Sequence, residues 1–463
     1  MTPLVPIALF GWIPVVLLLF ATLRPRTAVA TAFVVAWCFL PVAGYSILGL
    51  PDYTKMTATC YGVLLGTGLF HSGVFAKLRP HWIDLPMVVW CVVPLASSIS
   101  NGLGVYDGIS GVLSQTIVWG FPYLIGRLYF TEVRHLTVIV QTIIIFGIIY
   151  IPLCLFEIRM SPQLHYIFYG YYQHQFAQTM RYGGYRPMVF MNHGLQVGMW
   201  MGIALVLSVG SWRYGAWRTI RFMGILLPIV AVCAALGTTL ILVKSTGAIV
   251  LAAVGIAAIV SSHALKTAVP MAAIALSCVL YLGLRATQAW SGEGLVEMAA
   301  EVNEDRAASL EFRMYNENIL GDKARERPWF GWGGWGRGRI YDEDGNDISI
   351  TDGLWIVAFG MNGTVGLVSL YSAMLLGPTL LVMRCKPRRW RIEPETAIAA
   401  ALAVACMLEA ADSLPNGMQI PVMTMALGAV TGVAVGARQG ITHRRERSST
   451  APQNGVAAIK VVS

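Results

Sequence analysis

Arginine residues of this sequence could bind an anion such as a phosphate group. Arg181 and Arg186 precede Asn192 and His193 at the mouth of an apolar run, and Arg313 lies in a polar stretch much later in the chain. Guanidinium groups hold phosphate oxygens through paired, charge-assisted hydrogen bonds. The competing interpretation is that these arginines, with their aromatic neighbours, anchor the chain at a membrane surface.

A lysine and an aspartate stand at the heads of two further apolar runs. Lys244, in the sequence Lys244-Ser245-Thr246-Gly247, either extends its charge to water from a tight turn or faces an internal polar cavity. Asp352 precedes the run that begins at Gly353. Its carboxylate could act as a base toward a hydroxyl group, or it could simply cap the helix that follows.

Tryptophan and glycine alternate in the segment from Arg327 to Gly336. Glycine allows close approach of backbones, and tryptophan suits a membrane interface or a sugar face. A nucleotide-binding loop is excluded, because no strand and helix flank these glycines. Glu409 and Asp412, late in another run, are candidates to line a cavity or to pair with a cation.

Metal and cofactor chemistry is not expected. None of the eight cysteines has metal-ligand spacing, so they are interpreted as core residues, and no disulfide framework is visible. The acidic stretch 342–347 lacks the calcium-loop pattern, since its glycine comes too early, and is interpreted as a solvated turn.

The elements that position these residues are membrane helices. Hydrophobic residues make up 56% of the 463 residues and charged residues only 12%, which indicates an all-α integral membrane protein. Apolar runs of spanning length predict a bundle of about 12–13 transmembrane helices. The first run, from Pro6 to Leu23, lacks signal-peptide features and is expected to be retained. The expected starts are Pro6, Ala28, Met56, Leu85, Gly108, Leu136, Met188, Phe222, Ser245, Thr267, Gly353, Ala397 and Gln419.

Basic residues predict the orientation of the bundle. They fall in every second connection, so the net charge of +9 is a topology signal and no nucleic-acid partner is expected. This alternation places the C-terminus in the cytoplasm and two long connections, about 157–187 and 288–351, outside. The second connection holds 13 of the 24 acidic residues, and its pattern predicts a helix over 294–320 and a hairpin over 339–350.

The domain organisation follows from these runs. Residues 1–447 form a single polytopic membrane domain, and residues 448–463 form a polar, disordered cytoplasmic tail. No long-period repeat and no soluble domain is visible. The lipid bilayer is therefore an expected partner.

About residues 180–375 resemble the bacterial O-antigen ligase and O-antigen polymerase superfamily. Three blocks carry the resemblance in order, of which the last is the most specific. They are Arg186 to Gly194; Lys244 to Ala248; and Arg313, Arg327 to Gly333, Asp352 and Phe359 to Leu367. The resemblance departs at Thr246, where the family's turn carries an arginine, and at Asp352, where the family usually has a histidine.

The resemblance implies a multi-pass protein of the bacterial inner membrane that transfers a glycan without a metal. The implied donor is a polyprenyl-diphosphate-linked glycan, and the acceptor is a hydroxyl of a sugar or lipid-glycan in surface-polysaccharide biosynthesis. Asp352 and Arg313 are the expected catalytic residues. The expected substrate-binding residues are Arg181, Arg186, Asn192, His193, Lys244 and Arg327.

Several alternatives stay open at this point. Ligase and polymerase activities are not distinguished, and neither the sugar nor the acceptor is specified. A flippase or another transporter of lipid-linked glycans would favour charges at mid-bilayer and broken helices in paired halves. An inactive relative within a polysaccharide export system would agree with the two departures at Thr246 and Asp352.

Overall fold

The computed structural model describes residues 1–47, 50–181, 183–302, 304–334 and 336–449. Helix accounts for 72% of it, and the strands form only three short antiparallel pairs, which makes the fold all-α as expected. The first half contains α1 (Leu4–Phe10), α2 (Trp12–Thr22), α3 (Pro25–Phe39), α4 (Lys55–His71), α5 (Leu85–Ser100), α6 (Val105–Gln115), α7 (Phe121–Tyr129), α8 (Val133–Met160) and α9 (Leu164–Tyr169). The second half contains α10 (Gly194–Arg213), α11 (Ile229–Leu242), α12 (Thr246–Ala264), α13 (Val269–Ala286), α14 (Glu293–Val302), α15 (Glu304–Arg325), α16 (Leu354–Arg384), α17 (Pro394–Asp412) and α18 (Pro421–Ser449).

Each strand pair fills a connection between helices. The pairs are β1 (Gly44–Ile47) with β2 (Leu50–Thr54), β3 (Met180–Arg181) with β4 (Gly184–Tyr185), and β5 (Thr219–Phe222) with β6 (Ile225–Pro228). Because each pair is a local hairpin, the strands add no layer to the fold and serve only to fold loops back on themselves.

Each of the thirteen predicted apolar runs contains helix, and the chain is a multi-pass membrane protein, but fewer helices than the predicted 12–13 have spanning length. Within the described residues, seven helices are long and apolar enough to cross a membrane, or eight if α1 and α2, bent by 42° about Gly11, count as one. The remaining runs are shorter or interrupted; the run from Gly108 is divided between α6 and α7 by a π-helical turn at Thr116–Gly120.

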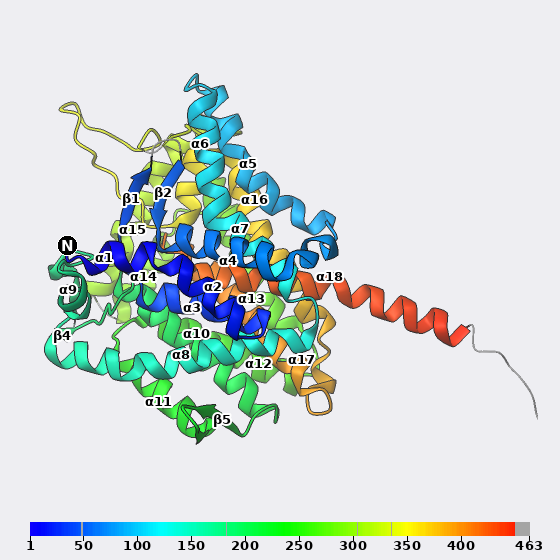
Figure 1. The fold of residues 1–463 in the computed structure, drawn as a ribbon. Helices are drawn as coiled ribbons and strands as arrows, with labels where there is room; N and C mark the ends of the chain where they lie inside the picture. Colours follow the sequence, from blue (N-terminus) through cyan, green and yellow to red (C-terminus); the bar gives the residue numbers. More distant parts are fainter. Residues whose placement is uncertain (48–49, 182, 303, 335, 450–463) are drawn as a thin grey trace, which may run out of the picture.

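Among the seven helices of spanning length, α10 and α17 are the most deeply buried, and they pack against each other. Buried residues make up 83% of the spanning window of α10 and 78% of that of α17. Figure 1 shows α8, α10 and α12 side by side, and both α8 and α12 contact α10. Small residues such as Gly210, whose added Cβ would lie 2.8 Å from the Ala401 side chain, permit this close packing.

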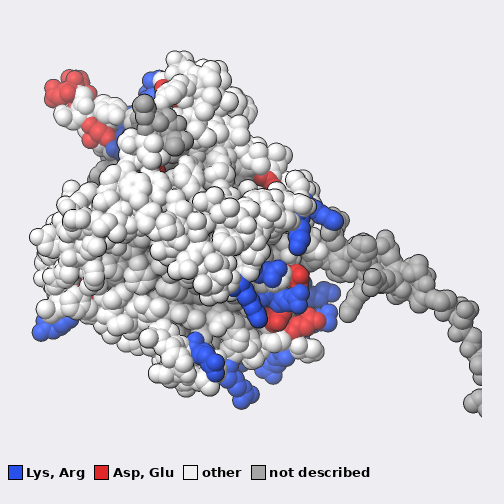
Figure 2. Space-filling view, in the orientation of Figure 1, with Lys and Arg blue, Asp and Glu red and all other residues white. Residues whose placement is uncertain are grey.

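The two ends of the bundle differ in charge and in structure. The N-terminus, α9 and β4 lie at one end, and α18 leaves at the other (Figure 1). Figure 2 shows Lys and Arg gathered at the end where α18 leaves, and acidic residues on a loop that projects elsewhere. The basic connections after α2, α4 and α7 meet there around one cavity. Those after α10, α12 and α16 meet through the rings of Tyr214, His263 and Trp390.

Several predicted boundaries were wrong. Helix α8 continues to Met160, so the connection placed at 157–187 begins at Ser161. The run from Phe222 begins as a hairpin, because its apolar residues also form β5 and β6, and α11 starts only at Ile229. The run from Met188 becomes helical at Gly194. The helix predicted over 294–320 is present as two helices, α14 and α15, whereas the hairpin over 339–350 is reduced to one bridge between Tyr341 and Asp347.

The end of the chain differs in part from the expected tail. Helix α18 continues to Ser449, so residues 448 and 449 are helical. The rest of the segment predicted to be disordered, 450–463, lies outside the described residues.

Candidate functional site

The centre of the candidate site is the contact between Arg313 on α15 and Asp352 immediately before α16. The Arg313 Nε lies 3.7 Å from Oδ2 of Asp352, and their side chains are 29% and 42% exposed. The same guanidinium donates hydrogen bonds through Nη1 to the Pro415 carbonyl (3.4 Å) and to Oδ1 of Asn416 (3.5 Å). Arg313 therefore bridges the start of α16 and the connection after α17, while part of its surface stays open to solvent.

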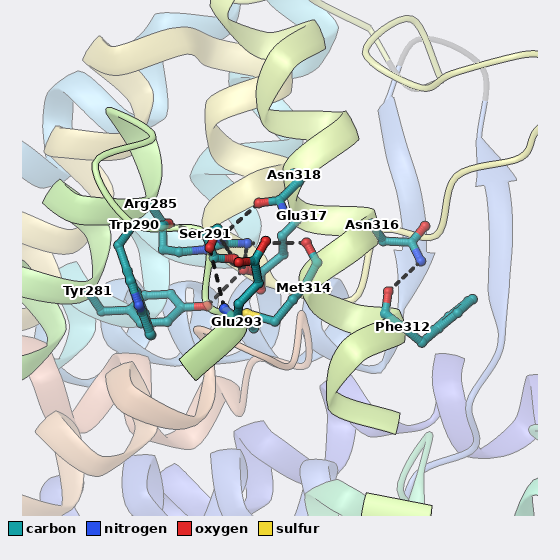
Figure 3. Close-up of polar contacts among 10 residues, drawn as sticks. All are labelled: Tyr281, Arg285, Trp290, Ser291, Glu293, Phe312, Met314, Asn316, Glu317 and Asn318. Carbon is teal, nitrogen blue, oxygen red and sulfur yellow. Dashed lines mark hydrogen bonds and ion pairs between the residues drawn. The ribbon is translucent and has the colours of Figure 1, made fainter. Parts of the chain in front are cut away.

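A buried ion pair fixes the helix that carries Arg313. Arg285 of α13 contacts Glu317 of α15 at 3.1 Å, and both side chains are almost fully buried. Figure 3 shows Tyr281 and Asn318 completing this network, in which the Tyr281 hydroxyl donates to the same Glu317 carboxylate oxygen. Because a buried charge is costly without a partner, this pair holds α15 against α13 in one register.

The opposite face of α15 is tied to the segment that leads to Asp352. Asn316 donates to the Phe312 carbonyl, as Figure 3 shows, and its Oδ1 accepts a hydrogen bond from the Ile350 amide at 2.8 Å. Asp352 follows Ile350 by two residues. The turn of α15 that carries Arg313 is thus also bonded to the segment that leads to Asp352.

Asp352 is not a helix cap, contrary to one of the two sequence interpretations. The N-cap of α16 is Gly353, which makes no side-chain capping bond. A Cβ at position 353 would lie 2.2 Å from the Leu414 carbonyl oxygen, so only glycine permits the approach of this backbone to the connection after α17. The Leu354 amide donates to the Ser413 carbonyl, which anchors the start of α16 there. The Asp352 carboxylate is left to face Arg313.

Arg186 lies in the loop between β4 and α10. Its side chain is buried, and its Nη2 donates to the Lys244 carbonyl at 3.3 Å. Its Nε is buried without a hydrogen-bond partner among the described atoms. Gly194 makes room for it, because a Cβ there would lie 2.3 Å from Cδ of Arg186. An unsatisfied, buried guanidinium N–H favours an anionic partner.

Lys244 connects Arg186 to Arg181. It occupies a left-handed conformation (φ 58°) in the short turn between α11 and α12. Its Nζ donates to the Arg181 carbonyl at 3.1 Å, and a Cβ at Gly184 would collide with it. The β3–β4 hairpin and the α11–α12 turn are thus locked together through the lysine.

Asn192 and His193 lie directly before α10. Asn192 is exposed, whereas the His193 ring is buried and its Nδ1 accepts a hydrogen bond from the Leu195 amide. His174 packs edge-on against it at 4.9 Å between ring centroids. His193 is therefore the N-cap of α10.

The positive charges of Arg181 and Arg313 act on Arg186 and His193. Burial, followed by the charges of Arg181 and Arg313, lowers the pKa of Arg186 to about 10. Burial also lowers the pKa of His193 to about 4, with additional contributions from His174 and from the same arginines. His193 is consequently neutral near pH 7. We call Arg181, Arg186, Lys244 and Arg313 the cation cluster; its charge can stabilise a bound diphosphate or a developing negative charge.

Glu157 positions the loop that carries Arg186, and it was missed in the sequence. Its side chain is 1% exposed at the end of α8. Its Oε2 accepts hydrogen bonds from the amides of Met188 (2.8 Å) and Val189 (2.7 Å), and Oε1 accepts one from Leu164. Val189 has a φ of 51°, a strained conformation for a β-branched residue. The signal available in the sequence was an acidic residue at the end of a long apolar run.

Arg327 lies apart from the cation cluster. It follows the end of α15, and residues 313 and 325 of that helix are separated by roughly 18 Å along its axis. The Arg327 guanidinium stacks on the ring of Trp332 at 4.7 Å, and Nζ of Lys323 also lies over this ring. The structure thus separates Arg327 from the other predicted binding residues.

The glycines beside Arg327 permit close backbone approach, as predicted. Gly331 has a φ of +67°, and a Cβ there would lie 2.5 Å from the Met361 carbonyl carbon. The amides of Trp332 and Gly333 donate to the Gly360 and Met361 carbonyls where α16 is interrupted at Gly363. The tryptophan of this segment at position 335 lies outside the described residues.

Glu409 and Asp412, the two acidic residues near the end of α17, have different contacts. Asp412 accepts a hydrogen bond from Asn416 at 3.0 Å, and Asn416 in turn accepts from Arg313. Glu409 is buried deeper, with Oε1 bonded to the Ile420 amide and Oε2 without a partner among the described atoms. Asp412 is therefore linked to the cation cluster, whereas Glu409 belongs to the interior of the bundle.

Comparison with known proteins does not name a family. No protein-family model matches the sequence, and no curated protein matches it. The fold therefore defines the class of this chain, which is an all-α, multi-pass membrane protein, and its candidate site is a cation cluster in which Arg313 contacts the Asp352 carboxylate.

Proposed function

We propose that this protein is a membrane glycan transferase, a ligase or polymerase of the O-antigen type. It moves a glycan from a polyprenyl diphosphate to an acceptor hydroxyl in surface-polysaccharide biosynthesis. The observation that carries the proposal is the contact between Arg313 and Asp352. The buried Arg186, whose Nε has no hydrogen-bond partner among the described atoms, supports it as a second cation. A diphosphate needs cations, and an attacking hydroxyl needs a base.

The proposed reaction needs no added energy source. The acceptor oxygen forms a bond to the anomeric carbon of the donor sugar, while the bond from that carbon to the diphosphate oxygen breaks. Asp352 takes the hydroxyl proton, and the polyprenyl diphosphate leaves with both electrons of the broken bond. Arg313 and Arg186 stabilise the charge that accumulates on the leaving group. The chemical energy is already present in the donor linkage.

The proposed location is the bacterial inner membrane, with the C-terminus in the cytoplasm. The basic connections lie at the end of the bundle where α18 leaves, and positive residues favour the cytoplasmic side. The N-terminus is bonded to α9 through the Thr2 amide and the Tyr169 carbonyl, in the segment that leads to the cation cluster. The transfer site therefore faces outward, where lipid-linked glycans are available after translocation.

Incubation of the purified protein with a polyprenyl-diphosphate glycan and a glycan acceptor tests the proposal. Formation of an extended acceptor, together with release of polyprenyl diphosphate, is the expected result. Movement of the donor across proteoliposomes without transfer would favour the flippase alternative. Donor binding without either event would favour an inactive relative, and the absence of binding would overturn the proposal.

A further inference from the structure

A cavity lies at the end of the bundle where the basic connections meet. Its volume is about 1030 Å³, which is in the range of cavities that hold small molecules. Residues from the connections after α2, α4 and α7 line it, together with the first turns of α8 and the middle of α18. Arg313 and Asp352 do not contribute to its walls, so it is separate from the proposed transfer site.

Basic side chains dominate the charged lining of this cavity. Arg24, Arg26, Lys77, Arg79 and Arg127 line it. Glu132 is the one acidic residue among the lining residues, and it is paired with Arg134 at 2.7 Å. The cavity therefore carries an excess of positive charge within reach of a single bound molecule.

Hydrogen bonds hold two of these arginines in place. Arg127 makes two 2.8 Å bonds to the Asp84 carboxylate and a third bond to the Arg79 carbonyl, which fixes the connection that carries Lys77. Arg26 donates through Nε to the Tyr129 carbonyl. Because the walls are fixed by these bonds, an anion would bind without the cost of ordering them.

The position of the cavity favours a lipid over a soluble anion as its ligand. It opens where apolar helices end, and apolar residues share its walls with the cations. These are Val74, Leu78, Leu128, Val138 and Val435. A phosphate would contact the cations, and the glycerol and upper acyl chain would contact these side chains. Basic pockets between helices on the cytoplasmic side are suited to such headgroups.

We propose that this cavity binds the phosphate headgroup of an anionic membrane lipid. Membrane orientation alone does not explain its form, because orientation requires positive charge on one side but no cavity. Arg218 and Arg221 provide the comparison, since they lie in an equivalent basic connection after α10, are exposed, and do not line the cavity. The proposal is independent of glycan transfer.

Thermal unfolding of the full-length protein in neutral detergent tests this site. The probes are phosphatidylglycerol, phosphatidylcholine and inorganic phosphate. We compare the wild type with Arg24→Gln/Lys77→Gln and with the matched control Arg218→Gln/Arg221→Gln. Arg24 and Lys77 are both exposed, so their replacement should leave the Tm in phosphatidylcholine unchanged.

Phosphatidylglycerol should raise the Tm of the wild type and of the control by roughly 3 °C or more relative to phosphatidylcholine. The cavity variant should lose at least half of that shift. An equal shift in all three proteins, or an equal loss in both variants, would show general surface attraction and overturn the proposal. The same shift with inorganic phosphate would overturn the choice of a lipid.

Discussion

Nε of Arg313 lies 3.7 Å from Oδ2 of Asp352, and this contact connects α15 to the start of α16. Both side chains are partly exposed, so the pair contributes only about 0–1 kcal/mol to stability. A bound diphosphate can therefore replace Asp352 as the partner of Arg313 at little energetic cost. In the proposed reaction this exchange releases the carboxylate toward the acceptor hydroxyl.

Replacement of Asp352 by asparagine should abolish transfer and leave the fold intact. Asparagine keeps the size of the side chain but cannot accept the proton. We expect the transfer rate to fall by roughly 100-fold or more, as for loss of a general base. Radiolabelled glycan transfer by the purified variant measures it. Glu343→Gln, in the exposed acidic loop, is the control, and a fully active Asp352→Asn protein would remove Asp352 from the mechanism.

Replacement of Arg313 by lysine should also impair transfer, although the charge is kept. Arg313 reaches Asp352 and Asn416 with different nitrogens, and a lysine ammonium cannot reproduce this forked geometry. We expect a loss of roughly 10-fold or more, corresponding to about 1.4 kcal/mol in the transition state. Arg325→Lys, on the same helix, should be unaffected. Equal activity of both variants would contradict a forked contact to the donor.

The sequence predicts the helices well because their apolar runs are long. Local pattern also indicates Arg186, Lys244 and Asp352, since each charge borders such a run, whereas Arg313 lies in a polar stretch and is indicated by the family resemblance of its block. The boundaries fail where apolar residues are equally suited to strand and helix, as in β5 and β6, whose Ile225 and Leu226 could have belonged to α11.

The residues that hold the site in place could not be predicted in the same way. Arg285 and Glu317 form a pair across two helices, and neither position specifies its partner from local sequence. Glu157 bonds to amides of Met188 and Val189, far along the chain. Such contacts depend on the three-dimensional packing of α8, α13 and α15, which periodicity does not encode.

Reporter fusions test the orientation of the bundle. Gly345 lies in the projecting acidic loop, between α15 and α16, and Ser449 ends α18. Alkaline phosphatase, which is active only outside the cytoplasm, should be active at Gly345 and inactive after Ser449. A cytoplasmic reporter should give the opposite pattern. Activity of one reporter at both positions would contradict the orientation and with it the outward-facing transfer site.

Replacement of Glu157 by glutamine should loosen the loop that carries Arg186. Glutamine has one acceptor oxygen where glutamate has two, so its NH2 must face either the amides of Met188 and Val189 or that of Leu164, and a buried unsatisfied N–H costs roughly 1–3 kcal/mol. We expect a lower Tm and faster hydrogen exchange over residues 185–192. Glu132→Gln, at the other end of α8 and exposed, should not change exchange in this loop. Unchanged exchange in Glu157→Gln would show that the loop is held by other contacts.

The buried His193 should make the protein less stable in acid. Burial, His174 and the nearby arginines lower the pKa of His193 to about 4, whereas an unfolded histidine has a pKa of about 6.5. As the pH falls from about 6.5 to about 4, the unfolded state therefore takes up a proton that the folded state does not. Stability is lost over this window, by at most about 3 kcal/mol, and no further loss follows below it.

His193→Asn isolates this effect, because asparagine caps a helix well and does not titrate. We expect the Tm of the wild type to fall more steeply than that of the variant between pH 7 and pH 4.5, with similar values above pH 7. His165 also has its pKa lowered to about 4, mainly by burial, but it is present in both proteins and its contribution cancels in the comparison. Thermal unfolding across this pH range measures the difference. Parallel curves for the two proteins would show that position 193 does not carry the acid sensitivity.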